Sequence, residues 1–298
     1  MGHLTAWFAR YFSDPQAVLM AVLLLVGLGV IVLFGDMLAP ALAAVVIAYL
    51  LEGVVRILER RGVRRGSGVF LVFILFMAFL VFLFFGLTPL LWTQTAELVR
   101  ELPQYIAAGR EAVSQLPQHY PFITEEQIDG AMEAVRSELM GMGQRVLSVS
   151  LSSIPGILTV IIYLVLVPLL VFFFLKDKGR IVGWLTGFLP RERGLATQVW
   201  REVDQQIGNY VRGKFWEILI VGAVTFVVFA LLGLKYSMLL AVLVGLSVII
   251  PYIGAATVTL PVAIIAYFQW GWSAEFAWVL VAYGIIQALD GNVLVPLL

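Results

Sequence analysis

The chain has 298 residues, of which 61% are hydrophobic and 13% are charged, and its formal net charge is zero. A soluble domain carries about 25% charged residues, so this apolar excess predicts a protein that faces lipid. The neutral charge gives no indication of nucleic-acid binding, and the absence of cysteine excludes disulfides, thiolate zinc sites and iron–sulfur ligation. Because every backbone amide must be hydrogen-bonded within hydrocarbon, long apolar runs predict helices, and the expected fold is an all-α polytopic membrane protein.

Runs without charged residues predict about eight hydrophobic segments. A membrane-spanning helix needs about 17–25 residues, and a charged side chain at its centre costs roughly 2.5–3.5 kcal/mol. The segments are expected, in chain order, at 17–34, 37–51, 69–91, 154–175, 218–234, 236–250, 255–270 and from Phe276 to the end. The first is interpreted as a retained span and not as a signal peptide, because no small-residue cleavage site follows the first apolar run.

The charges between these segments orient them. Loop 52–68 has five arginines against two acids, and loop 176–217 has eight Lys or Arg against five acids, whereas segment 92–153 has four arginines against eight acids. The positive-inside rule then predicts a bacterial inner-membrane protein with both basic loops and both termini in the cytoplasm and 92–153 outside. The expected interface tryptophans agree with this orientation: Trp92, Trp270, Trp272 and Trp278 at the outer face and Trp216 at the inner face.

Three parts of the chain follow from this topology. Residues 1–91 hold the first three segments with loop 52–68, residues 92–153 form a small extracytoplasmic helical domain, and residues 154–298 hold segments four to eight with loop 176–217 and hairpin 236–270. In the outer domain, Thr124 and Gln127 match a helix capping box. This domain is interpreted as a solvated cap, and an oligomer contact or a vestibule is the alternative.

Motifs for enzymatic chemistry are absent or incomplete. Residues 208–214 match the G-x4-G-K start of a phosphate-binding loop, but Phe215 follows where that loop needs Ser or Thr for Mg²⁺, so no ATP site is expected. The chain has no H-E-x-x-H motif, its only histidines are His3 and His119, and Ser148, Ser150, Ser152 and Ser153 have no histidine close in sequence. A nucleophile needs a base within hydrogen-bond reach, so the sequence predicts neither an enzyme nor a cofactor.

Asp290 is the most unusual single residue, because it lies 14 residues into the last hydrophobic segment. At about 1.5 Å per residue this depth is about 21 Å. Carboxylates within a membrane usually face a bundle interior or a wet cavity. Gln287 lies on the same helical face, and Gly291, Asn292 and Pro296 weaken regular helix. A coupling-ion or substrate role, a position at the cytoplasmic end of a shorter span, and a packing role between helices all remain open.

The charge-free run 236–274 is too long for one crossing, and the sequence Pro251-Tyr252-Ile253-Gly254 divides it. The two halves are expected to form either two tight crossings or a re-entrant hairpin with this sequence at its tip. A broken helix exposes backbone groups, which membrane proteins tolerate only beside protein or a water-filled cavity. Such breaks often mark a transporter binding site.

Several motifs together resemble the autoinducer-2 exporter family, also called the PerM-type permeases. They are Pro168 with 172–177, the 208–214 motif, 250–254 and 287–296, and their order matches across nearly the whole chain. One departure is Glu52-Gly53, where the family commonly has a proline, and another is the end at Leu298, where members usually continue. The resemblance implies export of the small polar signal autoinducer-2, or Na⁺(Li⁺)/H⁺ antiport, by a homo-oligomer, a pentamer, whose helical hairpins move as an elevator.

We therefore expect a secondary exporter of a small polar solute, with Na⁺ or H⁺ as a coupling ion. The predicted binding residues are Pro251, Tyr252, Gly254, Gln287, Asp290 and Asn292, and the predicted structural or interface residues are Pro168, Lys176, Asp177, Asn209, Arg212 and Pro296. Lys176, Asp177 and Arg212 are interpreted as interface ion pairs. The alternatives are a cation/proton antiporter that uses Asp290 as its carboxylate, although only one strongly intramembrane acid is evident, and a non-transporting envelope scaffold that assembles partners through 92–153.

Overall fold

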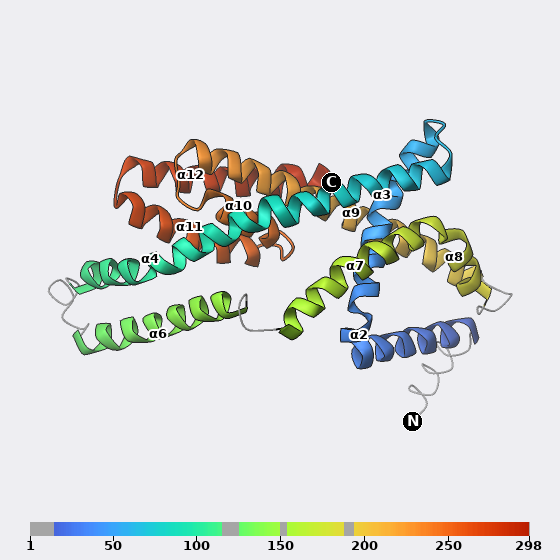
Figure 1. Ribbon diagram of the computed structural model, residues 1–298, viewed down its shortest axis with the longest axis horizontal. Helices are drawn as coiled ribbons and strands as arrows, with labels where there is room; N and C mark the ends of the chain where they lie inside the picture. The colour runs from blue at the N-terminus through green and yellow to red at the C-terminus, as the bar shows by residue number, and fades with distance from the viewer. Residues whose placement is uncertain (1–14, 115–124, 150–153, 188–193, 298) are drawn as a thin grey trace, which may run out of the picture. The chain divides into compact units, whose positions relative to one another are not determined.

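The computed structural model describes residues 15–114, 125–149, 154–187 and 194–297, and within these ranges the chain is helical and has no strand. The predicted all-α fold is therefore confirmed. The helices shown in Figure 1 are α2 (Pro15–Arg60), α3 (Arg65–Phe82), α4 (Thr88–Ser114), α6 (Glu125–Val149), α7 (Ile154–Lys176), α8 (Lys178–Gly187), α9 (Gly194–Leu231), α10 (Ser237–Ser247), α11 (Ile253–Trp270), α12 (Ala274–Leu289) and α13 (Val295–Leu297), with two π-helices, η1 (Leu83–Leu87) and η2 (Asp290–Leu294).

Six helical stretches among the described residues are long and apolar enough to cross a membrane. The number differs from the eight predicted segments at two places. Segments 17–34 and 37–51 follow one another within α2 without a loop, as two helices joined at a kink at Phe34 (φ −119°, ψ 18°). Asp36 interrupts the charge-free run, but one charged residue does not supply the several turn residues that a chain reversal needs. The second difference is α10, which has only 11 residues.

The chain forms two compact units, each built from two separate stretches of sequence. Unit 1 comprises Met1–Phe79 and Leu158–Val211. Its buried side chains include Val55 on α2, Val69 and Val72 on α3, and Val171 and Leu175 on α7. The rings of Phe73 and Phe172 also pack, with centroids 5.1 Å apart. These contacts pack parts of α2, α3 and α7 against one another.

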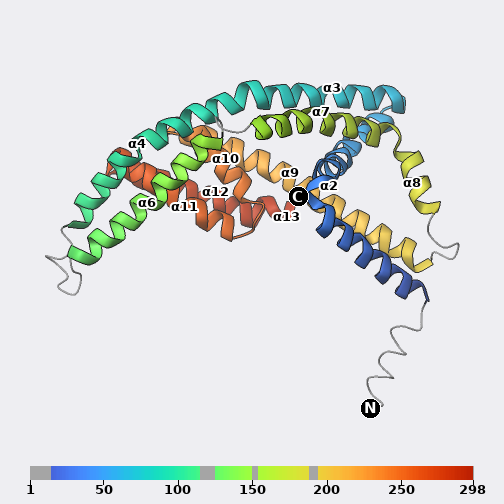
Figure 2. The same cartoon turned by 60° about the horizontal axis from the view of Figure 1, so that its bottom comes forward.

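Unit 2 comprises Leu80–Ile157 and Arg212–Leu298. Within it, α11 packs against α10 and α12, and α4 packs against α6 and α10 (Figures 1 and 2). The centre of its core is formed by five side chains that are almost fully inaccessible to solvent, Phe229, Leu240, Val244, Val262 and Val279. This packing fixes the relative positions of α9, α10, α11 and α12, and the predicted binding residues lie in the α10–α11 turn, at the start of α11, at the end of α12 and in η2.

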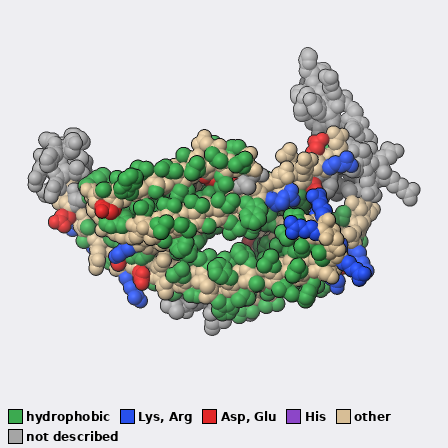
Figure 3. Space-filling view, turned by 90° about the horizontal axis from the view of Figure 1, so that it is seen from above, with side chains coloured by type: hydrophobic (Ala, Val, Ile, Leu, Met, Phe, Trp, Pro, Cys, Tyr) green, Lys and Arg blue, Asp and Glu red, His purple; other side chains and the backbone are tan. Residues whose placement is uncertain are grey.

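Large hydrophobic side chains also cover much of the outside of the described chain, as the green surface in Figure 3 shows. Leu33, Phe85 and Leu231 are each at least 73% exposed. Soluble proteins rarely expose apolar patches of this extent. Lipid tails are the solvent that suits such a surface. The exposed apolar residues and the six long apolar helices therefore both indicate a chain that lies in a membrane.

Two local features depart from regular α-helix. The π-helix η1 joins α3 to α4 without a loop, so one continuous helical rod extends from Arg65 to Ser114 and passes through residue 92, the predicted start of the outer domain. The π-helix η2 begins at Asp290 and continues the axis of α12 into α13. π-helical turns are rare and frequently occur at functional sites.

The three-part domain division of the sequence stays a prediction, and Thr124, His3 and His119 lie outside the described residues.

Candidate functional site

The turn between α10 and α11 occupies residues 248–252 in unit 2. Helix α10 ends at Ser247 and α11 begins at Ile253, so the break starts three residues before the predicted one. Tyr252 has φ +63° and ψ −50°, which is rare for a residue with a side chain, and it is 91% exposed. The 11 residues of α10 measure about 16 Å at 1.5 Å per residue, roughly half of the hydrocarbon thickness.

Glycines allow the backbones of this hairpin to approach one another closely. A Cβ atom on Gly254 would collide with the carbonyl oxygen of Ser247, so the turn requires glycine at this position. On the opposite side of α10, a Cβ atom on Gly245 would lie 2.9 Å from the carbonyl oxygen of Ile218 and 3.1 Å from the Cα atom of Gly222, both on α9. The predicted binding residue Gly254 thus has a packing role that is evident from the backbone alone.

A buried ion pair on α9 lies against the end of α10. The Nζ atom of Lys214 is 2.7 Å from Oε1 of Glu217, and it donates a second hydrogen bond of 2.8 Å to the carbonyl oxygen of Val248. The Glu217 residue is only 4% exposed. The last carbonyls of a helix have no partner within the helix and carry partial negative charge, so the Lys214 ammonium stabilises the C-terminal end of α10.

Asp290 and Gln287 lie one turn apart at the end of α12, and each has a buried polar atom. The atoms are Oδ1 of Asp290 and Nε2 of Gln287, and neither has a hydrogen-bond partner among the described residues. Glu217 and Lys214 are the charged groups that act electrostatically on the Asp290 carboxylate. The four side chains Lys214, Glu217, Gln287 and Asp290, which we call the α9–α12 polar cluster, therefore share one region of unit 2.

Two further polar groups belong to the same helices. The Tyr283 hydroxyl donates a 2.8 Å hydrogen bond to the carbonyl oxygen of Ala255, which ties α12 to the first turn of α11. Thr225 on α9 is fully buried, and its hydroxyl has no hydrogen-bond partner among the described residues. A buried polar atom without a partner costs about 1–3 kcal/mol. Such a cost indicates a site that a bound ion, water or solute can complete.

A second set of polar side chains connects α4 to the loop that precedes α10. Lys235 lies 3.2 Å from Glu101 on α4, and its backbone N–H donates to the side-chain oxygen of Gln269 at 2.8 Å. The Glu101 carboxylate also accepts a 2.6 Å hydrogen bond from Tyr105. Tyr236, the residue before α10, is buried. These contacts fix the start of α10.

The remaining predicted residues are dispersed. Asn292 is exposed and donates a 2.8 Å hydrogen bond to the carbonyl oxygen of Ala288, while Pro251 is exposed beside Tyr252 in the turn. In unit 1, Pro168 is buried within α7, the Lys176 ammonium lies 5.7 Å from the ring centroid of Phe172, and the Asp177 carboxylate lies 3.7 Å from Arg180. On α9, Asn209 is exposed and Arg212 is half-buried, and Pro296 is exposed on α13.

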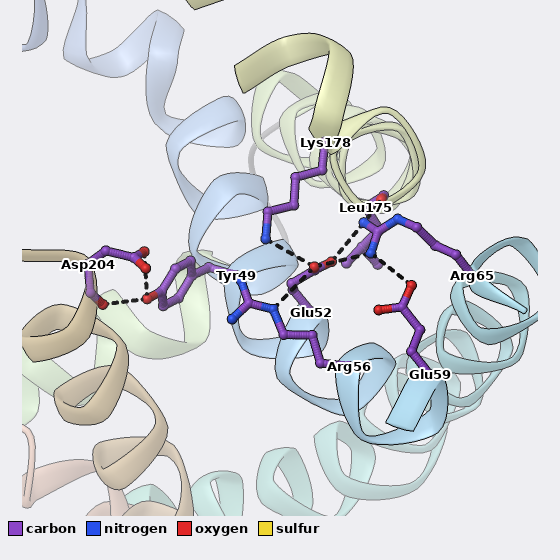
Figure 4. A network of polar contacts seen from close by, with 8 residues as sticks. All are labelled: Tyr49, Glu52, Arg56, Glu59, Arg65, Leu175, Lys178 and Asp204. Atoms are coloured by element: carbon purple, nitrogen blue, oxygen red, sulfur yellow. Dashed lines mark hydrogen bonds and ion pairs between the residues drawn. The ribbon is translucent and has the colours of Figure 1, made fainter. Parts of the chain in front are cut away.

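Sequence reasoning did not predict the burial of three charged residues, of which Glu217 and Glu52 are buried and Lys214 is half-buried. Lys214 appeared only as part of an incomplete phosphate-binding motif, and Glu217 only as a charge in loop 176–217. The third is Glu52, which is 6% exposed and accepts hydrogen bonds from Arg65 and Lys178 (Figure 4). The i, i+3 spacing of Lys214 and Glu217 at the edge of an apolar run was an available signal for the first two.

The described residues hold no group of three His, Cys, Asp or Glu side chains that fits a metal ion. An open groove of about 470 Å³ lies between α4 and α6 and is lined by charged residues that include Arg110, Asp129 and Arg136. This groove contains none of the predicted binding residues. The α9–α12 polar cluster is the stronger candidate site, because its polar groups are buried and incompletely paired, whereas those of the groove are exposed to water.

Comparison with known proteins identifies the family. Residues 20–298 match the model described as AI-2E family transporter. The chain belongs to the AI-2E transporter family. It is 47% identical over 296 residues to the protein named "Putative permease PerM" from Escherichia coli strain K12, covering 99% of this chain and 84% of that protein.

More distant members of the AI-2E family also match along most of the chain. The Bacillus subtilis protein named "Putative transport protein YueF" is 28% identical over 276 residues, which cover 90% of this chain and 73% of the relative. A second Bacillus subtilis protein, named "Putative transport protein YrrI", is 26% identical over 263 residues, or 86% of this chain and 72% of that relative. The family and the six apolar helices identify a multi-pass bacterial membrane protein of a transporter family.

Proposed function

We propose that this protein is a secondary exporter of a small polar solute and that the solute or its coupling ion binds at the α9–α12 polar cluster. The observation that carries the proposal is the pair of buried, unpaired atoms, Asp290 Oδ1 and Gln287 Nε2, one turn apart on α12. One is an acceptor and the other a donor. Together they suit a hydroxylated solute or an ordered water, which can accept one hydrogen bond and donate another.

The hairpin α10–α11 supports the same location. Its turn supplies backbone groups close to Lys214, which already bonds the carbonyl oxygen of Val248. Because α10 is about half as long as a crossing, we propose that 236–270 re-enters the membrane rather than crossing it twice. Tyr252 at the tip is almost fully exposed and Asn292 retains a free amide oxygen, so both remain candidates for contact with the solute.

Membership of the family supports a proposal for the substrate class and the assembly. We propose a small hydroxylated solute similar to autoinducer-2, exported by a homo-oligomer, with a pentamer as the expected form, in the bacterial inner membrane. Both termini then face the cytoplasm and 92–153 lies outside. An elevator-type movement requires two parts that stay internally rigid, and the division of the chain into two compact units supports such a movement.

Flux measurements in inside-out vesicles test the site. Asp290→Asn and Tyr252→Ala are expected to reduce export of labelled autoinducer-2 at least tenfold while the assembled protein remains intact on size-exclusion chromatography. Asp177→Asn is the matched control, because it makes the same chemical change at an interface residue outside the polar cluster and is expected to keep flux. Unchanged flux in both site variants would show that the solute does not bind here.

Glu217 supports a second candidate, a Na⁺(Li⁺)/H⁺ antiporter. The sequence indicates only one strongly intramembrane acid, Asp290, and the buried Glu217 adds a second carboxylate that acts electrostatically on it. Two carboxylates and one lysine can exchange a proton for a cation, because the charge of such a group depends on its protonation. Fluorescence dequenching of a pH gradient on addition of Na⁺ or Li⁺, with no solute present, distinguishes the two candidates, since an exporter that needs its solute gives no response.

A further inference from the structure

A group of basic side chains surrounds the ends of three candidate spans in unit 1. The candidate span on α2 ends at Arg60, the next begins at Arg65, and the span on α7 ends at Lys176. Residues that follow or precede a spanning stretch lie at the boundary between hydrocarbon and water. The basic side chains at 56–65 and 176–180, which we call the span-end basic cluster, therefore lie at the depth of lipid headgroups.

Glu52 pairs with several cations of this cluster (Figure 4). Its Oε2 atom lies 3.1 Å from Nη2 of Arg65 and its Oε1 atom 3.0 Å from Nζ of Lys178, and Arg56 lies 3.5 Å away. Arg65 in turn donates a 3.0 Å hydrogen bond to the carbonyl oxygen of Leu175. One buried carboxylate thus orders cations from α2, α3 and α8 within a few ångströms of one another.

The cluster has more positive charge than its own acids can balance. Its cations number eight, while Glu52, Glu59 and Asp177 are the only acids within 52–65 and 176–180. Arg60, Arg61 and Arg64 are exposed, and none of them forms an ion pair with another described residue. Figure 3 shows Lys and Arg side chains gathered beside one another at the surface. Three guanidinium groups are therefore free to bind an external anion.

Helix α8 indicates that this anion belongs to a lipid. The helix starts within the cluster at Lys178 and exposes Val182, Trp184 and Leu185 at 44%, 66% and 53%. Its 10 residues measure about 15 Å, too short to cross a membrane. Short helices that expose apolar residues and tryptophan beside basic residues lie in the membrane interface, with the tryptophan at headgroup level. A soluble partner anion would not require these apolar side chains.

We propose that the span-end basic cluster binds the phosphate groups of anionic phospholipids, with Arg60, Arg61 and Arg64 as the contacting residues. Guanidinium groups pair with phosphate through two parallel hydrogen bonds. Phosphatidylglycerol is favoured over phosphatidylcholine because its headgroup carries no ammonium that offsets the phosphate charge and repels the arginines. Glu52 positions Arg65 and Lys178, so that their charges add to the potential without contacting the lipid. This site is separate from the α9–α12 polar cluster and does not depend on the identity of the solute.

Native mass spectrometry of the full chain in detergent tests the proposal, with dioleoyl phosphatidylglycerol and dioleoyl phosphatidylcholine as competing lipids. We expect preferential retention of phosphatidylglycerol, and a loss of on the order of fivefold in relative affinity for each arginine removed in Arg60→Gln, Arg61→Gln and Arg64→Gln. The matched control removes the same number of charges elsewhere, as Arg100→Gln, Arg110→Gln and Arg136→Gln, and is expected to retain the preference.

Three results would overturn the proposal. The first is an unchanged preference in the span-end triple variant, and the second is an equal loss in the control variant, because net charge alone would then explain retention. The third is displacement of phosphatidylglycerol by millimolar inorganic phosphate, because the site would then recognise a soluble anion and not a lipid. The three arginines are exposed, so a size-exclusion profile that matches the unsubstituted protein is sufficient to show that the variant is folded.

Discussion

Replacing Gly245 by alanine is expected to separate helices α9 and α10, whereas replacing the facing Gly222 is expected to be tolerated. The new Cβ atom at position 245 would lie 2.9 Å from the Ile218 carbonyl oxygen and 3.1 Å from the Gly222 Cα atom. At position 222 the nearest atoms would be the Ala241 carbonyl oxygen at 3.6 Å and the Gly245 Cα atom at 3.8 Å, which are ordinary van der Waals distances. The obstacle at Gly245 is backbone, which cannot rotate away.

The expected difference in stability follows from comparing the two variants. Both gain the helix propensity of alanine over glycine, about 1 kcal/mol, so this contribution cancels in the difference. Overpacking of a close contact costs about 1–3 kcal/mol, and only Gly245→Ala incurs it. At about 2–4 °C of melting temperature per kcal/mol, Gly245→Ala is expected to melt roughly 2–12 °C below Gly222→Ala.

Intrinsic tryptophan fluorescence during heating in detergent measures this difference. Unfolding of a membrane protein from detergent is often irreversible, so both variants and the unsubstituted protein must be heated at one rate. The expected order of melting temperatures has Gly245→Ala lowest. Melting of the two variants at the same temperature would refute the close α9–α10 approach and, with it, the position of the hairpin beside Lys214 and Glu217.

Four further variants test three charged contacts. Lys214→Met leaves the buried Glu217 carboxylate without its cation and is expected to cost about 3–5 kcal/mol of stability. The double variant Lys214→Met with Glu217→Gln is expected to lose less. The same thermal melts in detergent compare the two. Glu52→Gln is expected to cost only about 1–2 kcal/mol in such melts, because its cations are a third exposed and water screens their repulsion; no change would contradict the role of Glu52 as their counter-ion. Lys235→Ala is expected to cost at most about 1 kcal/mol, and less in high salt, since its pair with Glu101 is exposed; a larger or salt-independent effect would contradict a surface pair.

The sequence by itself determined the fold class, because long continuous apolar runs in lipid satisfy their backbone hydrogen bonds as helices. A chain that is 61% hydrophobic with charge-free runs of membrane length must satisfy its backbone within helices. Local breaks were also predictable from chemistry. Pro251 and Gly254 indicated the turn between α10 and α11, and Gly291 and Asn292 indicated the departure from α-helix that the structure forms as η2.

Tertiary structure alone decided which charges are buried together. Lys214 and Asp290 are 76 residues apart in the sequence, and helical periodicity carries no information over that separation. The kink at Phe34 could not be predicted from the sequence either, because Asp36 has the same effect on the hydropathy pattern whether the helix ends there or only bends. Burial of Glu52 depends on Arg65 and Lys178 arriving from two other helices, and only packing brings those helices into contact.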